Sequence, residues 1–494
     1  MASNPVVREV PAPPSFLATR RGKLTLAFLC MVGFLDFVDA SIVNVALPSI
    51  RSDLHFSVQS LQWVLSGYLL TYGGFMLLGG RAADLLGRRR VLTTGIVVFA
   101  LASLTGGVAR DAGMLVAARL VQGIGAAMMV PAALSTLTTS FNEGADRNKA
   151  LGAWGGIAGL ASAVGVFLGG VLTEEASWRW VFWVNLPVAA VLLFATFRIV
   201  DGERDARRTR NFDSLGALLV TGGMLLLVYA LVKAPDQGWG SGRTIAELAG
   251  AAALVLAFVV NEHRHSNPLA PLSIFRINGL GAANATQVMA IGAFYAMFFF
   301  LTLYMQNVLG YSKLQAGSAY LPATAGVAIS SGIASQLFAR VGTRPIIVTG
   351  AIISAGAVYW LSRIPVHGSY LPNLLPGLLI MSIGLGCVFV GVNTAANAGV
   401  PPDKAGLAAA LINTSTWVGG ALGLAIFSVV ATSRTDHLLT AHIGQPEALT
   451  AGFHRALIAC SLFLIAAAAI ALRATNTRGE PVTVPDAQPA LDVV

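Results

Sequence analysis

The chain has 494 residues, of which 55% are hydrophobic and only 11% are charged. This composition is too apolar for a soluble globular protein of this size, and long apolar runs recur with short polar gaps between them. We therefore expect a polytopic membrane protein with no room for a soluble catalytic domain. The net charge of +9 is spread over short loops between the apolar runs. It indicates membrane topology and not a nucleic-acid surface.

Taken in chain order, the apolar windows predict an all-α fold with fourteen membrane spans. Placing both termini in the cytoplasm puts most Lys and Arg residues on that side, as the positive-inside rule requires. The N-terminal tail has no convincing small-residue cleavage site, so we expect an uncleaved first span in a cell membrane, with no signal peptide. The windows lie near 24–50, 59–79, 91–109, 113–138, 150–173, 180–197, 214–232, 245–262, 279–308, 314–338, 346–364, 373–398, 405–431 and 453–473.

The spans group as six, two and six, which predicts two homologous six-helix bundles joined by an inserted pair. The loop ARVGTRP at 339–345 follows the second span of one bundle, as GRAADLLGRRR at 80–90 does in the other. Such repeats place a substrate site at the bundle interface, near the midplane. The predicted divisions are a cytoplasmic tail (1–23), the first bundle (24–198), a basic linker (199–213), the inserted pair (214–262), a cytoplasmic linker (263–278), the second bundle (279–473) and a disordered tail (474–494).

Two carboxylates interrupt the first span, in the stretch LDFVDASIVNVALP at 35–48. A carboxylate at the bilayer centre costs roughly 2.5 to 3.5 kcal/mol, so Asp36 and Asp39 need a partner or a proton. Their spacing of three places them on one helical face, where two negative charges repel, so one of them should hold a proton readily. Arg119 in the fourth span is the expected cationic partner. For all three residues, a structural role in a buried polar network stays open.

The stretch at 80–90 resembles the loop signature of the major facilitator superfamily, G-x-x-x-D-x-x-G-R-R. Its members here are Gly80, Asp84, Gly87, Arg88 and Arg89. In that family the loop acts as a cytoplasmic latch that stabilises the outward-open state. The resemblance therefore implies a cytoplasmic gate at these residues. The alternative is a basic topology loop with incidental glycines.

Other stretches are similar to the fourteen-span drug:proton antiporters of that superfamily. The first span matches their first-helix signature, with Asp39 at the usual acidic position and Asp36 as an extra. In the fourth span, Arg119 and Gln122 stand in the pattern R-x-x-Q-G-x-G, which resembles the proton-coupling signature. Arg119 near an ionised aspartate would stabilise the charged carboxylate, and protonation would release the pair and favour a switch between inward-open and outward-open states. Asp39 is the expected proton carrier, and Asp36 is the second candidate.

One signature departs from the pattern of these antiporters. The fifth span reads GVFLGG at 165–170, with Val166 where a proline is usual. The glycines Gly165, Gly169 and Gly170 are retained, so close helix packing is still expected. Because this motif distinguishes antiport from uptake in the family, its altered form leaves the direction of transport open.

The resemblance implies a transporter, not an enzyme, that exports hydrophobic antibiotics or other toxic small molecules in exchange for protons by alternating access. The alternatives are a proton-coupled importer on the same fold and a membrane enzyme or sensor, although no catalytic set or P-loop is found. Protons would be the coupling ion, and neither a cofactor nor a metal is expected. The expected partners are a small hydrophobic substrate and membrane lipid, without nucleic acid. Because one chain holds both halves of the transport pathway, we expect a functional monomer.

Polar and aromatic side chains deep in the spans predict a candidate substrate cavity. Aromatic walls with few fixed charges suit flat, hydrophobic compounds that are neutral, zwitterionic or monocationic. The alternative for each aromatic residue is a lipid-facing or packing surface. The candidates are Trp63, Tyr68, Gln122, Tyr295, Phe298, Tyr304, Gln306, Asn393, Asn397 and Asn413.

Overall fold

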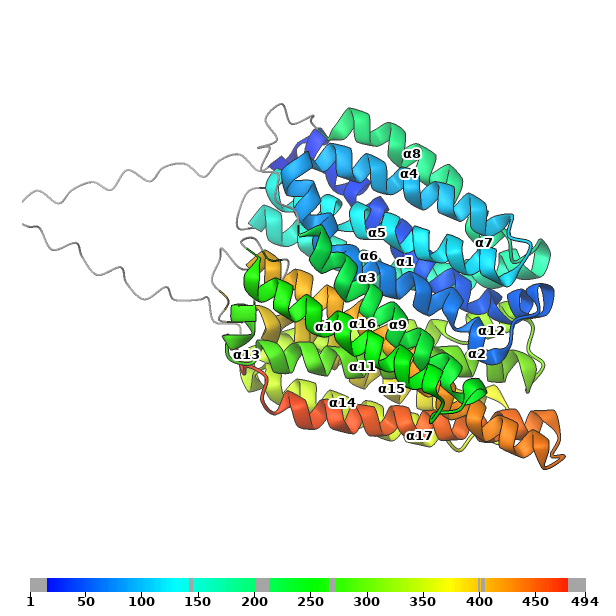
Figure 1. Cartoon of the computed structure of the whole chain (residues 1–494). Coiled ribbons are helices and arrows are strands. Elements are labelled where there is room, and N and C mark those ends of the chain that lie inside the picture. The colour runs from blue at the N-terminus through cyan, green and yellow to red at the C-terminus, as the bar shows by residue number, and fades with distance from the viewer. Residues whose placement is uncertain are drawn as a thin grey trace, which may run out of the picture.

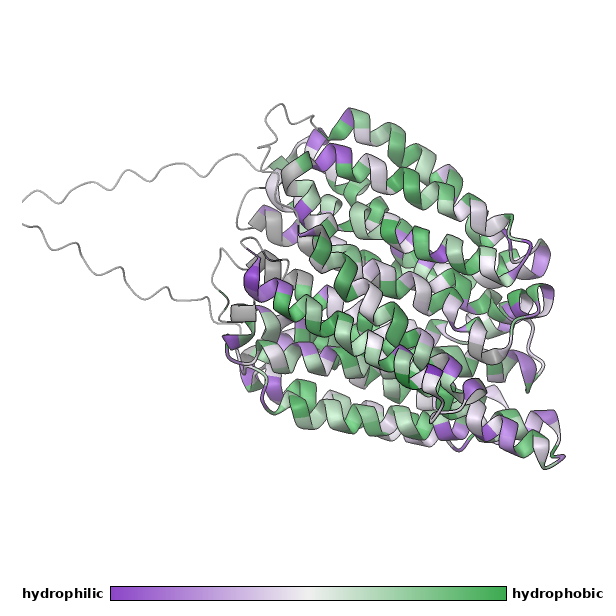
Figure 2. Ribbon diagram, viewed as in Figure 1, coloured by the Kyte–Doolittle hydropathy of each residue, from purple (hydrophilic) through white to green (hydrophobic). Residues whose placement is uncertain are grey.

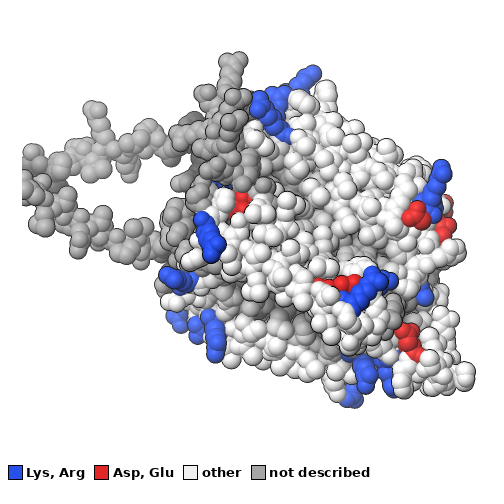
Figure 3. Space-filling model, in the orientation of Figure 1, with Lys and Arg blue, Asp and Glu red and all other residues white. Residues whose placement is uncertain are grey.

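The computed structural model describes residues 16–141, 145–200, 213–265, 268, 272–398, 400 and 405–478. Within these ranges the fold is helical, and the long helices run side by side (Figure 1). Hydrophobic residues fill the middle of the helices and hydrophilic residues gather at both ends (Figure 2). On the face drawn in Figure 3, charged residues leave a broad uncharged band between the two ends. A bilayer-spanning protein is expected to have this surface.

The first six predicted spans correspond to helices α1 to α8. Side chains fix the starts of two of them, because Thr19 Oγ1 accepts from Gly22 N and Asp111 Oδ1 accepts from Met114 N, each at 2.9 Å. After a short 3₁₀ helix η1 (Phe16–Ala18), the helices are α1 (Arg20–Leu54), α2 (Val58–Leu61), α3 (Trp63–Leu86), α4 (Arg88–Gly107), α5 (Ala112–Ser140), α6 (Ala145–Glu175), α7 (Trp180–Trp183) and α8 (Asn185–Ile199).

The inserted pair and the second bundle follow in the order that the hydropathy predicts. Gly342, between α13 and α14, has a φ of 86°, and Gly87 has a φ of 94° at the matching place between α3 and α4. Glycine adopts this backbone conformation without the steric cost of a side chain. The elements are α9 (Ser214–Gln237), α10 (Gly242–Arg264), η2 (Leu272–Arg276), α11 (Leu280–Asn307), α12 (Lys313–Ser318), α13 (Leu321–Val341), α14 (Thr343–Leu361), η3 (Tyr370–Leu374), α15 (Leu375–Asn397), α16 (Ala405–Thr440) and α17 (Gln445–Ala471).

Among the described residues, 11 helices are long and apolar enough to cross a membrane. The protein is therefore a multi-pass membrane protein. A helix occupies each predicted window, although α3, α6 and α9 are not among these 11. The count of fourteen spans, the cytoplasmic placement of both termini and the domain boundaries stay predictions. Most of the two predicted tails and of the basic linker, namely 1–15, 201–212 and 479–494, lies outside the described residues.

Helix α3 contacts both the second bundle and the inserted pair. A Cβ atom added at Gly73 would lie 2.9 Å from Trp417 Cβ on α16, and one added at Gly74 would lie 2.2 Å from Thr221 Oγ1 on α9. Such approaches are possible only where the residue has no side chain. Because α9 also contacts α16, the inserted pair covers the line along which α3 and α16 meet (Figure 1).

Hydrogen bonds join the two bundles where α1 and α6 end. We call this the outer end, because the predicted topology places it outside the cell. Gln306 Nε2 on α11 donates to Val45 O on α1 at 3.0 Å. Lys313 Nζ on α12 donates to Thr173 O on α6 at 3.1 Å. These bonds hold the bundles together at the outer end.

Glu174 adds a charged contact at the outer end, where its carboxylate accepts a bond from Leu314 N at 2.8 Å. This backbone bond, with a second bond from the Ser312 hydroxyl, lowers the pKa of Glu174 from its ordinary value. We expect Glu174→Gln to raise the opening of the outer end about fivefold, because it removes the charge that strengthens both bonds. The readout is the rate at which a membrane-impermeant thiol reagent labels Thr173→Cys, because Thr173 lies at this contact and is only 2% exposed.

The matched control is Glu175→Gln, one residue further along the same helix, which should leave the labelling rate unchanged. In the wild type, labelling should stay constant from neutral pH down to about pH 5 and rise only under stronger acid. The sign follows from the lowered pKa, because the contact is complete above the ordinary pKa and is lost as the pH falls through the lowered one. Equal rates in Glu174→Gln and Glu175→Gln would contradict the contact's role.

Candidate functional site

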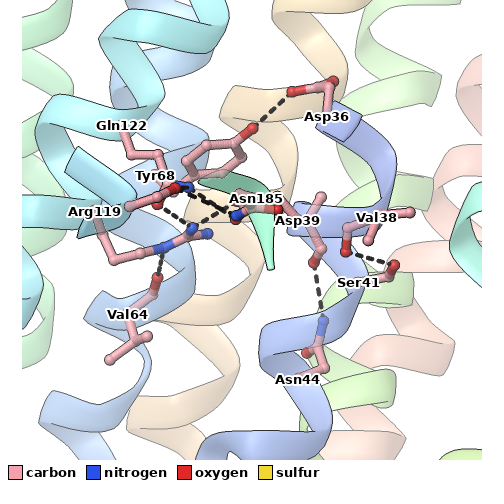
Figure 4. Close-up of polar contacts among 12 residues, drawn as sticks. Asp36, Val38, Asp39, Ser41, Asn44, Val64, Tyr68, Arg119, Gln122 and Asn185 are labelled. Atoms are coloured by element: carbon pink, nitrogen blue, oxygen red, sulfur yellow. Dashed lines mark hydrogen bonds and ion pairs between the residues drawn. The ribbon is translucent and has the colours of Figure 1, made fainter. Parts of the chain in front are cut away.

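A buried ion pair between α1 and α5 lies at the centre of the first bundle (Figure 4). Arg119 Nη1 is 2.7 Å from Asp39 Oδ2, and the two side chains are 1% and 0% exposed. Arg119 also donates from Nε to Val64 O at 2.9 Å and from Nη1 to Gln122 Oε1 at 2.7 Å. The structure thus brings together the arginine of the fourth span and an acid of the first, as their residue types indicated.

Further donors surround the second oxygen of Asp39. Oδ1 accepts from Gln122 Nε2 at 2.8 Å and from Asn185 Nδ2 at 2.7 Å. Both amides also donate to Ser103 Oγ, at 2.7 and 3.3 Å. A carboxylate with a guanidinium partner and two amide donors is stable in its charged form, even when buried. Sequence reasoning missed Asn185 and Ser103, because each is an uncharged polar residue in an apolar window and no motif marks it.

Gly123 allows the approach of α3 that completes this network. A Cβ atom at Gly123 would lie 2.4 Å from Tyr68 O, so any larger residue would push α3 away from α5. The approach places Val64 O within reach of Arg119 and the Tyr68 ring beside it, with Arg119 Cζ 4.2 Å from the ring centroid. The ring face adds a favourable interaction with the cation. All residues of this network belong to the first bundle.

Asp36 lies one turn before Asp39 and has a different environment. Tyr68 Oη donates to its Oδ1 at 2.7 Å and Tyr72 Oη to its Oδ2 at 3.0 Å. The side chain is fully buried, and it makes no ion pair within the described part of the chain, because Arg119 is bound to Asp39. Within the described residues, Asp36 is therefore a buried carboxylate held by two neutral hydroxyls, of which Figure 4 shows that of Tyr68. A proton on Asp36 would remove a buried charge without taking the partner of Arg119 away, whereas a proton on Asp39 would leave Arg119 unpaired.

Aromatic residues of both bundles meet beside Asp36. The Tyr72 ring stacks on Trp417 of α16 at 4.3 Å between centroids, and Tyr68 contacts the same indole edge-on at 6.4 Å. Tyr295 of α11 lies against Gly420 of α16, 3.0 Å from an added Cβ. Tyr68 and Tyr295, two of the predicted cavity residues, therefore both lie along α16. Tyr72 and Trp417 were not predicted, although the spacing of four between Tyr68 and Tyr72 could have indicated a shared face.

The other predicted cavity residues do not join this cluster. Phe298 stacks on Tyr320 inside the second bundle, at 3.9 Å between centroids. Tyr304 is fully buried and donates to Pro365 O, while Gln306 bonds across the outer end. Gln122 belongs to the Asp39 network. The other four are half-buried or exposed, and their place in a cavity stays a prediction: Trp63, Asn413, Asn393 and Asn397.

The predicted gate loop contacts helices of its own bundle. Arg88 donates to Ser135 Oγ at 2.9 Å and to Thr139 Oγ1 at 2.7 Å, both on α5. Arg89 donates to Phe197 O at 3.4 Å, with its guanidinium 4.9 Å from the Phe197 ring centroid. The Asp84 side chain lies outside the described residues. The latch function of this loop, including that of Gly80 and Gly87, stays a prediction.

The glycines of the fifth-span motif pack α6 against both bundles. Added Cβ atoms at Gly165 and Gly169 would lie 2.8 Å from Val38 O and 2.5 Å from Ile42 O, on α1. One at Gly170 would lie 2.9 Å from Leu314 Cα, on α12. The close packing expected of this helix is thus present without the usual proline. Helix α6 continues from Ala145 to Glu175, and Val166 is buried within it.

We expect Gly169→Ala to lower the free energy of unfolding by about 1 to 3 kcal/mol, because the added methyl meets backbone that cannot move without separating α1 from α6. Thermal unfolding in detergent measures this effect. Gly332→Ala on α13 is the matched control, since an added Cβ there has nothing within 4 Å. Equal stability of the two variants would contradict the packing described for α6.

The comparisons with known proteins agree with this architecture. The sequence model of the Major Facilitator Superfamily matches residues 29–424. A puromycin resistance protein of Streptomyces alboniger is 39% identical over 432 residues, which cover 86% of this chain and 85% of that protein. A cephamycin export protein of Amycolatopsis lactamdurans is 38% identical over 455 residues, covering 92% of each chain. A tetracenomycin C resistance and export protein of Streptomyces glaucescens is 32% identical, covering 85% and 76%.

Solved structures support the fold at lower sequence identity. A bacterial homologue of the human lysosomal transporter Spinster, in an inward-facing and unoccupied conformation, matches with a TM-score of 0.65 and 16% identity, covering 92% of this chain and 97% of that one. A D-xylose–proton symporter matches with a TM-score of 0.61 and 13% identity, covering 90% and 97%. Together with the buried charges and the glycine motifs, these matches confirm the resemblance: the chain belongs to the Major Facilitator Superfamily.

Proposed function

We propose that this protein is a proton-driven exporter of hydrophobic antibiotics or other toxic small molecules, which works by alternating access. The observation that carries this proposal is the pair of unlike carboxylates on α1, one bound to Arg119 and the other held only by tyrosine hydroxyls. Relatives that resist or export puromycin, cephamycin and tetracenomycin C support the export of antibiotics. We place the protein in the plasma membrane of a bacterium, acting as a monomer with protons as its coupling ion.

The two carboxylates have different roles in this proposal, which differs from the expectation that Asp39 carries the proton. Asp39 stays charged, because removing its charge would leave the Arg119 guanidinium buried without a partner. Asp36 takes and releases the proton, because no buried cation loses its partner when Asp36 becomes neutral. The ion pair therefore holds α1 against α5, while Asp36 is neutral when it binds the proton and negatively charged when it releases it.

The energy of one proton is sufficient for useful export. Across a membrane potential of roughly 100 to 150 mV it supplies about 2.3 to 3.5 kcal/mol, which supports an approximately 50- to 350-fold accumulation of a neutral substrate. A single protonating carboxyl such as Asp36 can therefore drive transport without a second coupling site.

Inverted membrane vesicles with an acidic lumen test the direction of transport. An exporter moves the fluorescent monocation ethidium, or puromycin, into the lumen while protons leave it. Collapse of the gradient with a protonophore should stop this uptake. A proton-coupled importer, which the altered fifth-span motif left open, would instead release either compound from preloaded vesicles together with protons. That result would overturn the proposal.

A further inference from the structure

Any proton-driven exporter must convert a charge change in one bundle into movement of the other. The network of Asp39, Arg119, Gln122 and Asn185 lies wholly inside the first bundle, so it cannot act on the second bundle directly. The Asp36 cluster differs in this respect. Tyr72, which donates to Asp36 Oδ2, stacks on Trp417 of the second bundle.

We propose that Tyr72 and Trp417 form the contact through which protonation of Asp36 acts on the second bundle. This inference rests on the proposed proton-driven function and goes beyond it, because it assigns a positioning role to two residues that contact neither Arg119 nor Asp39. The Tyr72 hydroxyl changes its hydrogen bond when Asp36 is protonated. The Tyr72 ring, which stacks on the indole of Trp417, transmits this change to the second bundle. Trp417 holds the other side of the contact.

The hydrogen bonds of Asp36 show why the contact must respond to a proton. An ionised carboxylate accepts from both tyrosines, but a protonated carboxyl carries its own hydrogen on one oxygen. The hydroxyl that faces this oxygen can then no longer donate to it, so its own hydrogen must turn elsewhere while its oxygen accepts the hydrogen of the carboxyl. The Tyr72 bond, at 3.0 Å, is longer than the Tyr68 bond, at 2.7 Å, so we assign the reversed bond to Tyr72.

Trp417 lies on a part of α16 that is hydrogen-bonded to α11 in the second bundle. Its neighbours on α16 bond to α11, with Ser415 Oγ donating to Asn284 Oδ1 at 2.7 Å and Gln287 Nε2 donating to Thr416 Oγ1 at 2.9 Å. Any displacement of the Tyr72 ring that accompanies this reversal therefore acts on a residue that moves only with its bundle. Gly73 brings the backbone of α3 against this same tryptophan, so no flexible side chain intervenes to absorb the displacement.

The indole N–H of Trp417 independently indicates that this contact can adopt a second conformation. The residue is 4% exposed, and its Nε1 has no hydrogen-bond acceptor among the described residues. A buried donor without an acceptor is unfavourable, so the indole gains from any rearrangement that offers it one. Reversal of the bond between Tyr72 and Asp36 permits such a rearrangement at this contact.

Among the titratable groups at this contact, Asp36 is the one whose charge we expect to change. The titratable residues that face it are Asp39 on its own helix, Tyr68 and Tyr72 on α3, Arg119 on α5 and Tyr295 on α11. Asp39 and Arg119 satisfy each other, and buried tyrosines stay neutral at physiological pH. A pH-dependent signal at Trp417 is therefore assigned to Asp36.

Tryptophan fluorescence in lipid nanodiscs tests the contact without requiring transport. The emission of wild type minus that of Trp417→Phe reports Trp417, and we expect it to change with pH in one titration step. Asp36→Asn should abolish the step, and Tyr72→Phe should abolish it while keeping the ring stacked. Tyr359→Phe, an exposed tyrosine on α14, is the control and should leave the step unchanged. Trp417 emission that ignores pH, or that titrates normally in Tyr72→Phe, overturns the proposal.

Transport gives the second readout. In Trp417→Leu we expect ethidium binding within about twofold of wild type and at least a tenfold loss of proton-driven export, with partial recovery in Trp417→Phe. Trp360→Phe, on the exposed face of α14, should leave both unchanged. If the protein exchanges ethidium for protons but the emission of Trp417 does not change with pH, the proposed role of the Tyr72–Trp417 contact is wrong and the proposed function stands. If the emission of Trp417 changes with pH but the protein exchanges no protons for ethidium, the proposed function is wrong and the contact still responds to Asp36.

Discussion

Asp39→Asn is expected to abolish transport and to destabilise the protein by about 3 to 5 kcal/mol. The substitution leaves the Arg119 guanidinium buried with no counter-charge, and breaking one side of a buried pair has a cost of this size. It also places an amide where Gln122 and Asn185 both donate to an oxygen. Denaturation in detergent measures the stability, and ethidium uptake in vesicles measures transport.

The matched control is Asp53→Asn on the same helix. Asp53 pairs with Arg179 at 2.7 Å, but the two side chains are 46% and 29% exposed. Solvent screens such a pair, so we expect a change of about 1 kcal/mol or less and nearly normal transport. Equal destabilisation by the two substitutions would show that the Asp39 pair contributes no more than a surface contact.

Asp36→Asn is expected to remove proton coupling while leaving stability within about 1 kcal/mol of wild type. An asparagine at this position can still accept from one tyrosine and donate to the other, and no cation loses its partner. Ethidium should then equilibrate across the membrane without accumulating, even under an imposed proton gradient. A flux assay with and without the gradient separates this result from a simple loss of activity.

The opposite pattern would reverse the assignment of the two acids. If Asp36→Asn accumulates ethidium normally and Asp39→Asn folds stably but loses only its gradient dependence, then Asp39 carries the proton. The ion pair with Arg119 would then be the element that opens during transport. The two single variants, measured in parallel for stability and coupling, decide between these arrangements.

The helices and the central ion pair could be predicted from the sequence. Apolar windows located each helix, because a bilayer requires a run of about 20 apolar residues. Arg119 and an acid of the first span could be paired because an isolated charge in a membrane is so costly that one buried charge indicates another. The choice of Asp39 over Asp36 as the partner depends on how α1 is rotated, which the spacing of three does not determine.

The contacts between distant helices could not be predicted. Tyr72 and Trp417 are more than 300 residues apart, and only the docking of α3 on α16 places their rings together. Asn185 and Ser103 join one network through the packing of α4 on α5 and of α8 on α4 and α1. Tyr304 and Gln306 resembled cavity residues because they are polar groups in an apolar helix, but each binds a backbone carbonyl instead.

Proton movement during ethidium entry into proteoliposomes tests the central claim most directly. With a pH indicator in the lumen and no imposed gradient, ethidium added outside flows inward through either orientation of the protein. An antiporter must then move protons out, so we predict that the lumen of wild-type vesicles becomes alkaline and that Asp36→Asn admits ethidium with no pH change. Acidification of the wild-type lumen, or unchanged proton movement in Asp36→Asn, would contradict the account.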